Sequence, residues 1–282
     1  MTTPDRAAMP IVSFHRTAAG RLAARLDGYC MMAVPGATGL SVLGAYNIDR
    51  APEDWVRSDF YIVGKSVETE EAFRAHAREL AQDKIDRAAL HRTEVTYHGQ
   101  TPWGPAQVST RYGDGVVFHS TASHGGFALD DAALVMVDPR WGIDGRFFEE
   151  DADWAIVAFS FPKLFTAYER KHADEILRNW HPDGYEIVAH ARLKPGESWV
   201  KDERRFRRLH ARDWVVISAV TSEHQPGFVE CVATRGAQRG NRAGRRFLVP
   251  CDEYRPGPFG FVIDEARHVS YEGPSSFIAD RR

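Results

Sequence analysis

The sequence predicts an α+β fold in which antiparallel sheets pack with several helices. Three observations support this fold class. Short apolar runs separated by Gly and Pro, typical of strands joined by tight turns, occur towards both ends of the chain. Residues 67–92 instead repeat apolar side chains every three or four positions, as an amphipathic helix does. The chain shows no fixed-period repeat, so a repeat architecture is not expected.

The first 95 residues predict an N-terminal α+β region. Strands are expected in three apolar runs, at residues 11–14, 29–34 and 40–46. The helix over residues 67–92 begins with the acidic sequence ETEE, which suits the positive end of a helix dipole. Residues 33–44 are glycine-rich, but a strand rather than a helix is expected after them, so we predict no dinucleotide site there. The sequence contains no pattern that identifies a cofactor.

Residues 96–282 predict a second α+β region. Two strands, residues 106–112 and 116–121, are joined by Gly-Asp-Gly, which is a strong hairpin signal. A helix is expected over residues 147–161, followed by another with Ser160 as its cap and Pro162 in its first turn. The remaining elements are a charged helix and an antiparallel meander, expected at residues 201–213 and at residues 214–221, 227–234 and 245–250.

The composition excludes several classes of protein. With 282 residues, 43% of them hydrophobic and 27% charged, the chain has a globular composition. A net charge of -3 argues against a generally basic nucleic-acid-binding protein. No apolar stretch reaches the length of a membrane span and no signal-peptide core is seen, so we expect a soluble, cytoplasmic protein. The three cysteines have neither metal-site nor disulfide-framework spacing, in keeping with a reducing compartment.

The strongest site signal is GVVFHSTASHGGFAL, residues 115–129. In a strand, alternation places His119 and Ser120 on opposite faces, and His124 follows just beyond the strand. Gly125 and Gly126 permit backbone conformations whose amide groups bind an anion or a developing oxyanion. The same residue types also make ordinary turns, so this segment needs support from elsewhere.

That support comes from the acidic sequence FFEEDADWAIV. On the predicted helix, Glu149 and Glu150 each share a face with Asp153, where carboxylates can accept protons or orient a histidine. Acidic residues also gather at helix starts because of the dipole, which is the commoner explanation. The apolar face that begins at Trp154 favours the functional interpretation, since apolar surroundings shift carboxyl pKa values. Neither histidines nor cysteines show metal-ligand spacing, and no metal is predicted.

A loop rich in arginine, TRGAQRGNRAGRRF at residues 234–247, contains no acidic residue. Guanidinium groups match phosphate geometry, which makes this loop a candidate for binding nucleic acid or nucleotides. The candidate ligands are Arg235, Arg239, Arg242 and Arg245. Most charge runs are solvated loops, and that is the competing interpretation.

Several segments together resemble an uncharacterised family of bacterial proteins carried by plasmids, phages and related mobile elements. The segments are TPWGPAQ, GVVFHSTASHGGFAL, EEDADWAIVAFSFPKLFTAYER, WVVISAVTSEHQPG and FGFVIDEARH. The resemblance covers residues 101–277 and rests on TPWG, ST-x-(S/G)HGG and EED-x-x-W-A patterns. The matching positions are Trp103, Gly104, Ser120, Thr121, His124, Gly125, Gly126, Glu149, Glu150, Asp151 and Trp154. The resemblance implies which residues matter and supplies no reaction.

We therefore predict one pocket formed by the His124 turn and the acidic segment. The candidate catalytic residues are His124, Glu150, Asp153, Ser120 and His119. The candidate substrate-binding residues are Trp103, Thr121, Gly125, Gly126 and Glu149. Such groups suit a hydrolase or transferase acting on a polar or phosphate-bearing substrate. The alternatives are a non-enzymatic module that binds nucleic acid, a nucleotide or a host-defence protein, and an assembly surface built on Trp154, Phe161 and Phe165; the oligomeric state is not predicted.

Overall fold

A computed structural model describes residues 12–240 and 244–277 of the protein. The chain divides into two compact units, with the boundary between Leu177 and Arg178. Both units combine helices with antiparallel sheet, which confirms the predicted α+β fold. That residues 1–95 form a region of their own remains a proposal.

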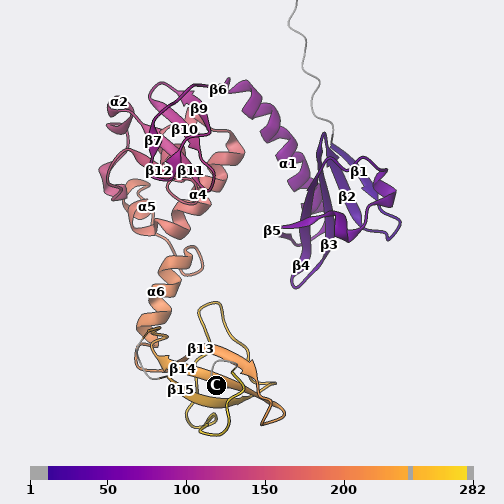
Figure 1. The fold of residues 1–282 in the computed structure, drawn as a ribbon, viewed down its shortest axis with the longest axis vertical. Helices are drawn as coiled ribbons and strands as arrows, with labels where there is room; N and C mark the ends of the chain where they lie inside the picture. The colour runs from indigo at the N-terminus through magenta and orange to yellow at the C-terminus, as the bar shows by residue number, and fades with distance from the viewer. Residues whose placement is uncertain (1–11, 241–243, 278–282) are drawn as a thin grey trace, which may run out of the picture. The chain divides into compact units, whose positions relative to one another are not determined.

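The first unit begins with an antiparallel sheet whose strands follow chain order (Figure 1). They are β1 (Val12–Arg16), β2 (Leu22–Leu26), β3 (Tyr29–Gly36), β4 (Gly39–Tyr46) and β5 (Tyr61–Val67). The sequence predicted β1, β3 and β4 but missed the other two. Arg25 interrupts the apolar run of β2, and Gly64 and Lys65 interrupt β5, so neither strand shows a clear pattern. The glycine-rich residues 33–44 form most of the β3–β4 hairpin.

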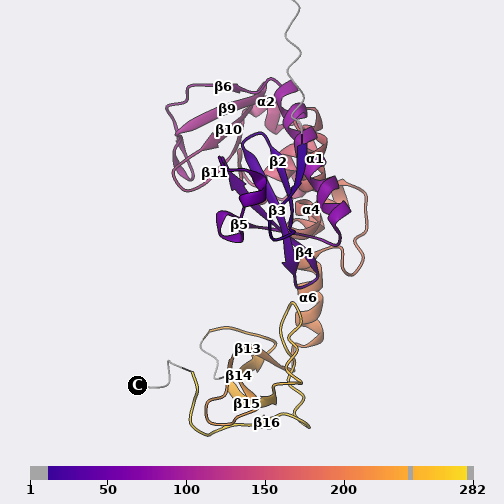
Figure 2. The ribbon, with the colours of Figure 1, turned by 90° about the vertical axis from the view of Figure 1, so that its right-hand side faces the viewer.

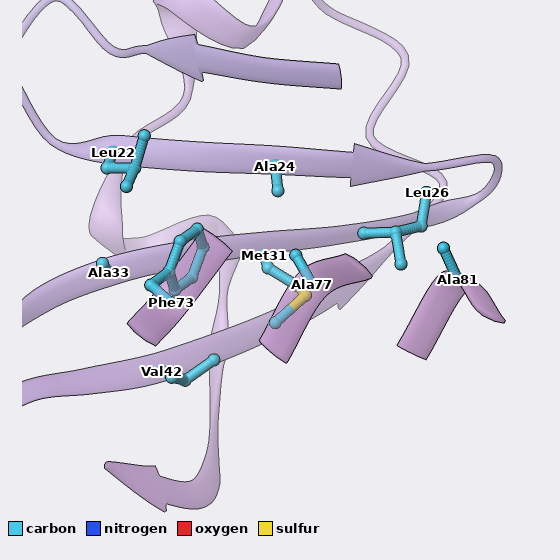
Figure 3. Close-up of a cluster of buried hydrophobic side chains, with 9 residues drawn as sticks. All are labelled: Leu22, Ala24, Leu26, Met31, Ala33, Val42, Phe73, Ala77 and Ala81. Carbon is cyan, nitrogen blue, oxygen red and sulfur yellow. The ribbon is translucent and has the colours of Figure 1, made fainter. Parts of the chain in front are cut away.

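Helix α1 (Glu70–Ala89) covers one face of this sheet, which confirms the predicted helix. Thr69 caps the helix, because its hydroxyl accepts a hydrogen bond from the Ala72 amide at 3.1 Å. Phe73, Ala77 and Ala81 follow at steps of four residues and pack on apolar side chains of β2, β3 and β4 (Figure 3). On the opposite face, a second apolar cluster is built around Trp55 and Phe60, so this sheet is buried on both sides.

The candidate site residues of the first unit lie in and around another antiparallel sheet, ordered β12–β11–β10–β9–β6 (Figure 2). Its strands are β6 (Thr93–Glu94), β9 (Val108–Gly113), β10 (Val116–Ser120), β11 (Gly125–Leu129) and β12 (Phe147–Glu149); β7 (Gln100–Thr101) and β8 (Gly104–Pro105) pair separately. The predicted β9–β10 hairpin is confirmed, and its turn places Gly115 at a φ of 70°. Ser109, His119, Gly126 and Glu149 are direct cross-strand partners and therefore share one face.

The predicted helix over residues 147–161 is wrong in its first half. Phe147–Glu149 pair with β11 as strand β12. A turn follows, and helix α3 (Trp154–Ser160) begins five residues after the last strand residue. Phe148 is buried while its neighbours are only partly covered, which is the pattern of a strand. Pairing with β11 decides the conformation here, and a local sequence window does not contain that partner.

The remaining helices of the first unit are α2 (Asp131–Leu134) and α4 (Ala167–Trp180), whose last residues lie in the second unit. Ser160 is not the cap of α4 as predicted, because it is the last residue of α3. Thr166 caps α4 instead: its hydroxyl accepts from the Glu169 amide at 3.1 Å, and the Glu169 carboxylate accepts from the Thr166 amide at 2.9 Å. Pro162 lies in the short 3₁₀ turn Pro162–Leu164, so the predicted break between the helices is confirmed.

The second unit contains two further helices and an antiparallel sheet. These elements are α5 (Pro182–Val188), α6 (Trp199–Leu209), β13 (Trp214–Thr221), β14 (Phe228–Arg235), β15 (Arg245–Pro250) and β16 (Val269–Ser270). The strands pair in that order, which confirms the predicted charged helix and meander. Within both units, the helices of the described residues are too short or too polar to cross a bilayer.

Candidate functional site

A tight turn between β10 and β11 holds His124 in place. Thr121, which is buried, clamps this turn: its hydroxyl donates to the His124 carbonyl at 2.6 Å and accepts from the His124 amide at 3.2 Å. The Thr121 amide also donates to the His124 carbonyl, at 2.8 Å. These bonds fix the backbone of the turn while the imidazole projects outward, with 56% of its side chain exposed. Thr121, a predicted substrate-binding residue, thus lies inside the turn.

The two glycines after His124 are strand residues and not part of a loop as predicted. Gly125 and Gly126 open β11, and neither adopts a positive φ. Their missing side chains make room for neighbours. A Cβ on Gly125 would lie 2.6 Å from Glu150 Oε2, and one on Gly126 would lie 2.3 Å from both Phe148 O and a ring carbon of Trp103. Close packing, rather than an anion-binding backbone conformation, therefore explains this pair.

The His124 side chain meets the carboxylate of Glu150, which follows β12 directly. Nδ1 of His124 lies 3.9 Å from Oε1 of Glu150. The Glu150 amide donates to the Gly125 carbonyl at 3.0 Å, so the backbone of the acidic turn is anchored beside the histidine turn. The Glu150 side chain is 37% exposed, which leaves both members of the pair accessible to a ligand. The structure thus brings together two residues that are 26 positions apart in the sequence.

The other two acidic candidates occupy different positions from those predicted. Because α3 begins only at Trp154, neither Glu149 nor Glu150 shares a helical face with Asp153. The Glu149 carboxylate accepts hydrogen bonds from the Asp151 amide at 2.6 Å and the Ala152 amide at 3.3 Å, so it stabilises the turn between β12 and α3. Asp153 directly precedes the helix.

Glu150 also lines a cavity of about 280 Å³ that the sequence analysis did not predict. Its wall is mostly aromatic and comprises Tyr112, Phe118, Phe127, Trp154, Phe165 and Tyr168. Several rings pack edge to face or tilted, with the Tyr112 and Phe127 centroids 4.8 Å apart and the Phe118 and Phe127 centroids 5.1 Å apart. His172 completes the rim, with its ring 5.9 Å from that of Trp154.

A charge network closes one side of this cavity. The Arg92 guanidinium donates to both oxygens of the Glu169 carboxylate, at 2.9 and 2.6 Å, and stacks 3.8 Å from the centre of the Tyr112 ring. Arg87 bridges Asp83 at 2.9 Å and Glu169 at 3.3 Å. Burial alone would raise the pKa of Glu169, but hydrogen bonds from Arg92 and the Thr166 amide outweigh it and hold this pKa below its usual value.

His119 and Ser120 lie on opposite faces of β10, as strand alternation predicts. His119 is 2% exposed, its Nδ1 lies 2.8 Å from Ser109 Oγ, and the Tyr97 ring covers it at 4.2 Å between centroids. Burial lowers the pKa of His119, so its imidazole is neutral. The candidate His119 is therefore on the sheet face away from the aromatic cavity, which Phe118 lines. Ser120 is the cross-strand partner of Gly125.

Trp103 belongs to the same face as His119. Its ring packs against Gly126 and stands edge-on to Phe147, with centroids 5.9 Å apart. That face also carries a more open groove of about 640 Å³, lined by Tyr97, Arg111, His119 and Phe147 among others. The predicted site residues are thus divided between two faces of one sheet. Ser120 and Gly125 share the face of Phe118 and Phe127, and Glu150, which lines the aromatic cavity, lies beside His124.

The arginine-rich loop belongs to the second unit. Arg235 stacks on Trp214 at 4.2 Å from the ring centre, and Arg245 does so at 5.7 Å. Both also pair with Glu265, at 3.5 and 3.6 Å. Arg239 makes a long hydrogen bond of 3.5 Å to the Ile217 carbonyl, and Arg242 lies outside the described residues. Two of the predicted phosphate ligands therefore already have an acidic partner that the local sequence did not reveal.

The cavity could not be predicted from local sequence, because its aromatic wall comes from three strands, two helices and the segment before α4. Phe118 and Phe127 stand on neighbouring strands, whereas Trp154 and Tyr168 belong to different helices. Strand alternation in β10 predicts that Phe118 and His119 lie on opposite faces of the sheet. It does not predict which aromatic rings from other elements pack beside Phe118. Within residues 12–240 and 244–277, no three His, Cys, Asp or Glu side chains are grouped as metal ligands would be.

Comparison with known proteins supports an uncharacterised family. No curated protein and no solved structure matches the chain. Residues 96–211 match the family model described as a domain of unknown function (DUF7007). This range contains the His124 turn, Glu150 and the aromatic cavity except for Arg87, so the chain is similar to that family across the candidate site.

Proposed function

We propose that the chain binds a small polar substrate at the aromatic cavity and that His124 and Glu150 form a proton-transferring pair at its mouth. The 3.9 Å approach of the imidazole to a carboxylate that also lines the cavity carries this proposal. A hydrolase or transferase reaction fits best, because both require a group that takes up and releases a proton near neutral pH.

The local structure supports this assignment in two ways. The backbone of each member is fixed, since Thr121 clamps the histidine turn and the Glu150 amide bonds to Gly125, while both side chains remain exposed. Glu150 also has a cavity of ligand size on its other side, whereas a carboxylate that served only to cap a helix or hold a turn would not need one. Glu149 is an example of the second kind, because its carboxylate is occupied by backbone amides.

The test uses the full chain with three chromogenic probes, p-nitrophenyl acetate, p-nitrophenyl phosphate and bis(p-nitrophenyl) phosphate. We expect turnover of at least one ester, and a loss of roughly 100-fold in kcat/KM for both His124→Ala and Glu150→Gln, as removing a general acid or base typically causes. Asp144→Asn, which removes an exposed carboxylate that lies outside the motifs and does not line the cavity, is the control and should keep activity. Turnover that survives in both variants, or none in the wild type, would contradict this reaction.

A binding function without catalysis is the second candidate, and the cavity itself favours it because a pocket needs no proton transfer to hold a ligand. The mobile-element setting that the sequence resemblance implies would suit a module that binds a small signal molecule. In that case cavity substitutions would abolish ligand binding, while His124→Ala would leave it intact. A nucleic-acid interface at the arginine loop has less support, since Arg235 and Arg245 both pair with the carboxylate of Glu265.

A further inference from the structure

The aromatic cavity has a wall suited to one chemical class of ligand. Its wall contains six aromatic rings, and the electron-rich face of such a ring attracts a cation through the ring quadrupole. The cluster already holds one cation in this way. Arg92 lies 3.8 Å from the centre of Tyr112 and 5.6 Å from that of Phe165, two rings of the cavity wall, although Arg92 itself does not line the cavity.

The charges around the cavity leave one carboxylate available to a ligand. Arg87 and Arg92 are matched by Asp83 and Glu169, which receive hydrogen bonds from them. Within the part of the chain that the structure describes, the ion-pair partner of the Glu150 carboxylate is the imidazole of His124, at 3.9 Å, a distance beyond direct hydrogen bonding. A carboxylate at the edge of an aromatic wall attracts a positively charged group and repels an anion.

The two phenols in the wall remain neutral. Burial raises the pKa of Tyr112 and of Tyr168, so neither ring carries a negative charge that would change the chemistry of the wall near neutral pH. At about 280 Å³ the cavity is at the small end of ligand pockets, and it suits a compact group rather than a nucleotide.

We propose that this cavity binds a small organic cation of the alkylammonium class, held by the aromatic rings and by the Glu150 carboxylate. This inference rests on the proposed function, because it names the substrate class for the same site. Trp154 is the ring to test, since it is only partly buried and belongs to the first turn of α3. Phe127 and Phe165, by contrast, are core residues, at 2% and 3% exposure.

The experiment measures binding of choline to the full chain by calorimetry, in comparison with its neutral carbon isostere, in which a tert-butyl group replaces the trimethylammonium group. The two probes have the same shape and differ in charge. We expect choline to bind about tenfold more tightly, the preference that a desolvated cation–π site with a nearby carboxylate supplies. Glu150→Gln should remove most of this preference, and Asp144→Asn should change it less than about twofold because Asp144 is exposed and does not line the cavity.

A second variant separates the rings from the carboxylate. Trp154→Leu keeps an apolar side chain, so we expect it to weaken choline binding about fivefold while affecting the isostere less. Thermal melting of each variant identifies any loss of fold. Equal affinity for the two probes, no binding of choline, or a preference that survives Glu150→Gln would each overturn the proposal.

The outcomes also distinguish this inference from the proposed function. Binding of choline with the expected preference, together with ester turnover that is indifferent to His124→Ala, would retain the cation site and reject proton transfer. If His124→Ala loses turnover but the wild type does not prefer choline over its neutral isostere, the proton-transferring pair is supported and the cation site is rejected.

Discussion

Two histidines five residues apart on the β10–β11 hairpin differ in burial and in the residues that they contact. His119 is enclosed between Ser109 and Tyr97 and belongs to the sheet face that carries Trp103. His124 is exposed on a clamped turn and lies 3.9 Å from the carboxylate of Glu150, which lines a cavity. In sequence both are histidines next to serine and threonine. Burial and partners separate a structural imidazole from one that a ligand can reach.

Gly125 and Gly126 also lie on opposite faces of the sheet. Among the substitutions considered, we expect those at this glycine pair to lower the free energy of unfolding most. In Gly126→Ala the new methyl group would meet the backbone carbonyl of Phe148, which cannot move without disturbing β12, as well as the Trp103 ring. We expect a loss of about 3 kcal/mol in the free energy of unfolding. Gly125→Ala should lose less, because its closest contact is the movable end of Glu150 and its approach to a backbone carbonyl, that of His119 at 2.8 Å, is less severe than the 2.3 Å at Gly126. Urea unfolding checks both, and the reverse order would contradict the packing described.

The histidines themselves provide the next comparison. His119→Ala leaves the buried Ser109 hydroxyl without its partner and opens a void under Tyr97, so we expect a loss of about 2 kcal/mol. His124→Ala removes an exposed ring and should change the unfolding free energy by less than about 0.5 kcal/mol. Chemical denaturation of the two variants under the same conditions measures both changes in the free energy of unfolding. A stability loss of similar size for His124→Ala would make that residue structural.

The pH dependence of stability sharpens the contrast. Burial lowers the pKa of His119 in the folded protein below the value of about 6.5 that an unfolded chain shows. The unfolded chain therefore binds a proton first as the pH falls, and the stability contributed by the neutral imidazole is present above about pH 6.5 and declines below it. His119→Gln should reduce this decline. Unfolding free energies measured from pH 7.5 down to about 5 test this, and an unchanged slope in the variant would contradict a neutral, buried His119.

The sequence predicted the elements that depend on local signals. The Asp-Gly turn after Tyr112 defines the β9–β10 hairpin, and the spacing of Phe73, Ala77 and Ala81 defines α1. The proximity of His124 and Glu150 also followed from the motifs, although for the wrong reason, since a strand and turn rather than a helix deliver the carboxylate. The acidic residues looked helical because acids favour helix starts.

What the sequence did not predict depends on pairing between distant segments. Strand β12 forms because β11 offers an edge, and the space over Gly126 is filled by Trp103 from 23 positions earlier. The aromatic cavity likewise draws its wall from strands and helices that no local window contains. Glu265 forms ion pairs with two arginines that lie 20 or more residues away in the chain. Tertiary contacts of this kind override local propensity.

The central claim is that His124 and Glu150 act as one unit at the cavity mouth. A double-mutant cycle on kcat/KM for whichever p-nitrophenyl ester the wild type hydrolyses tests it most directly. If the two residues share a single proton-transfer step, His124→Ala combined with Glu150→Gln should be no more than about threefold worse than the poorer single variant. Losses that multiply, so that the double variant falls by the product of the two single effects, would show that the residues act independently and would contradict the claim.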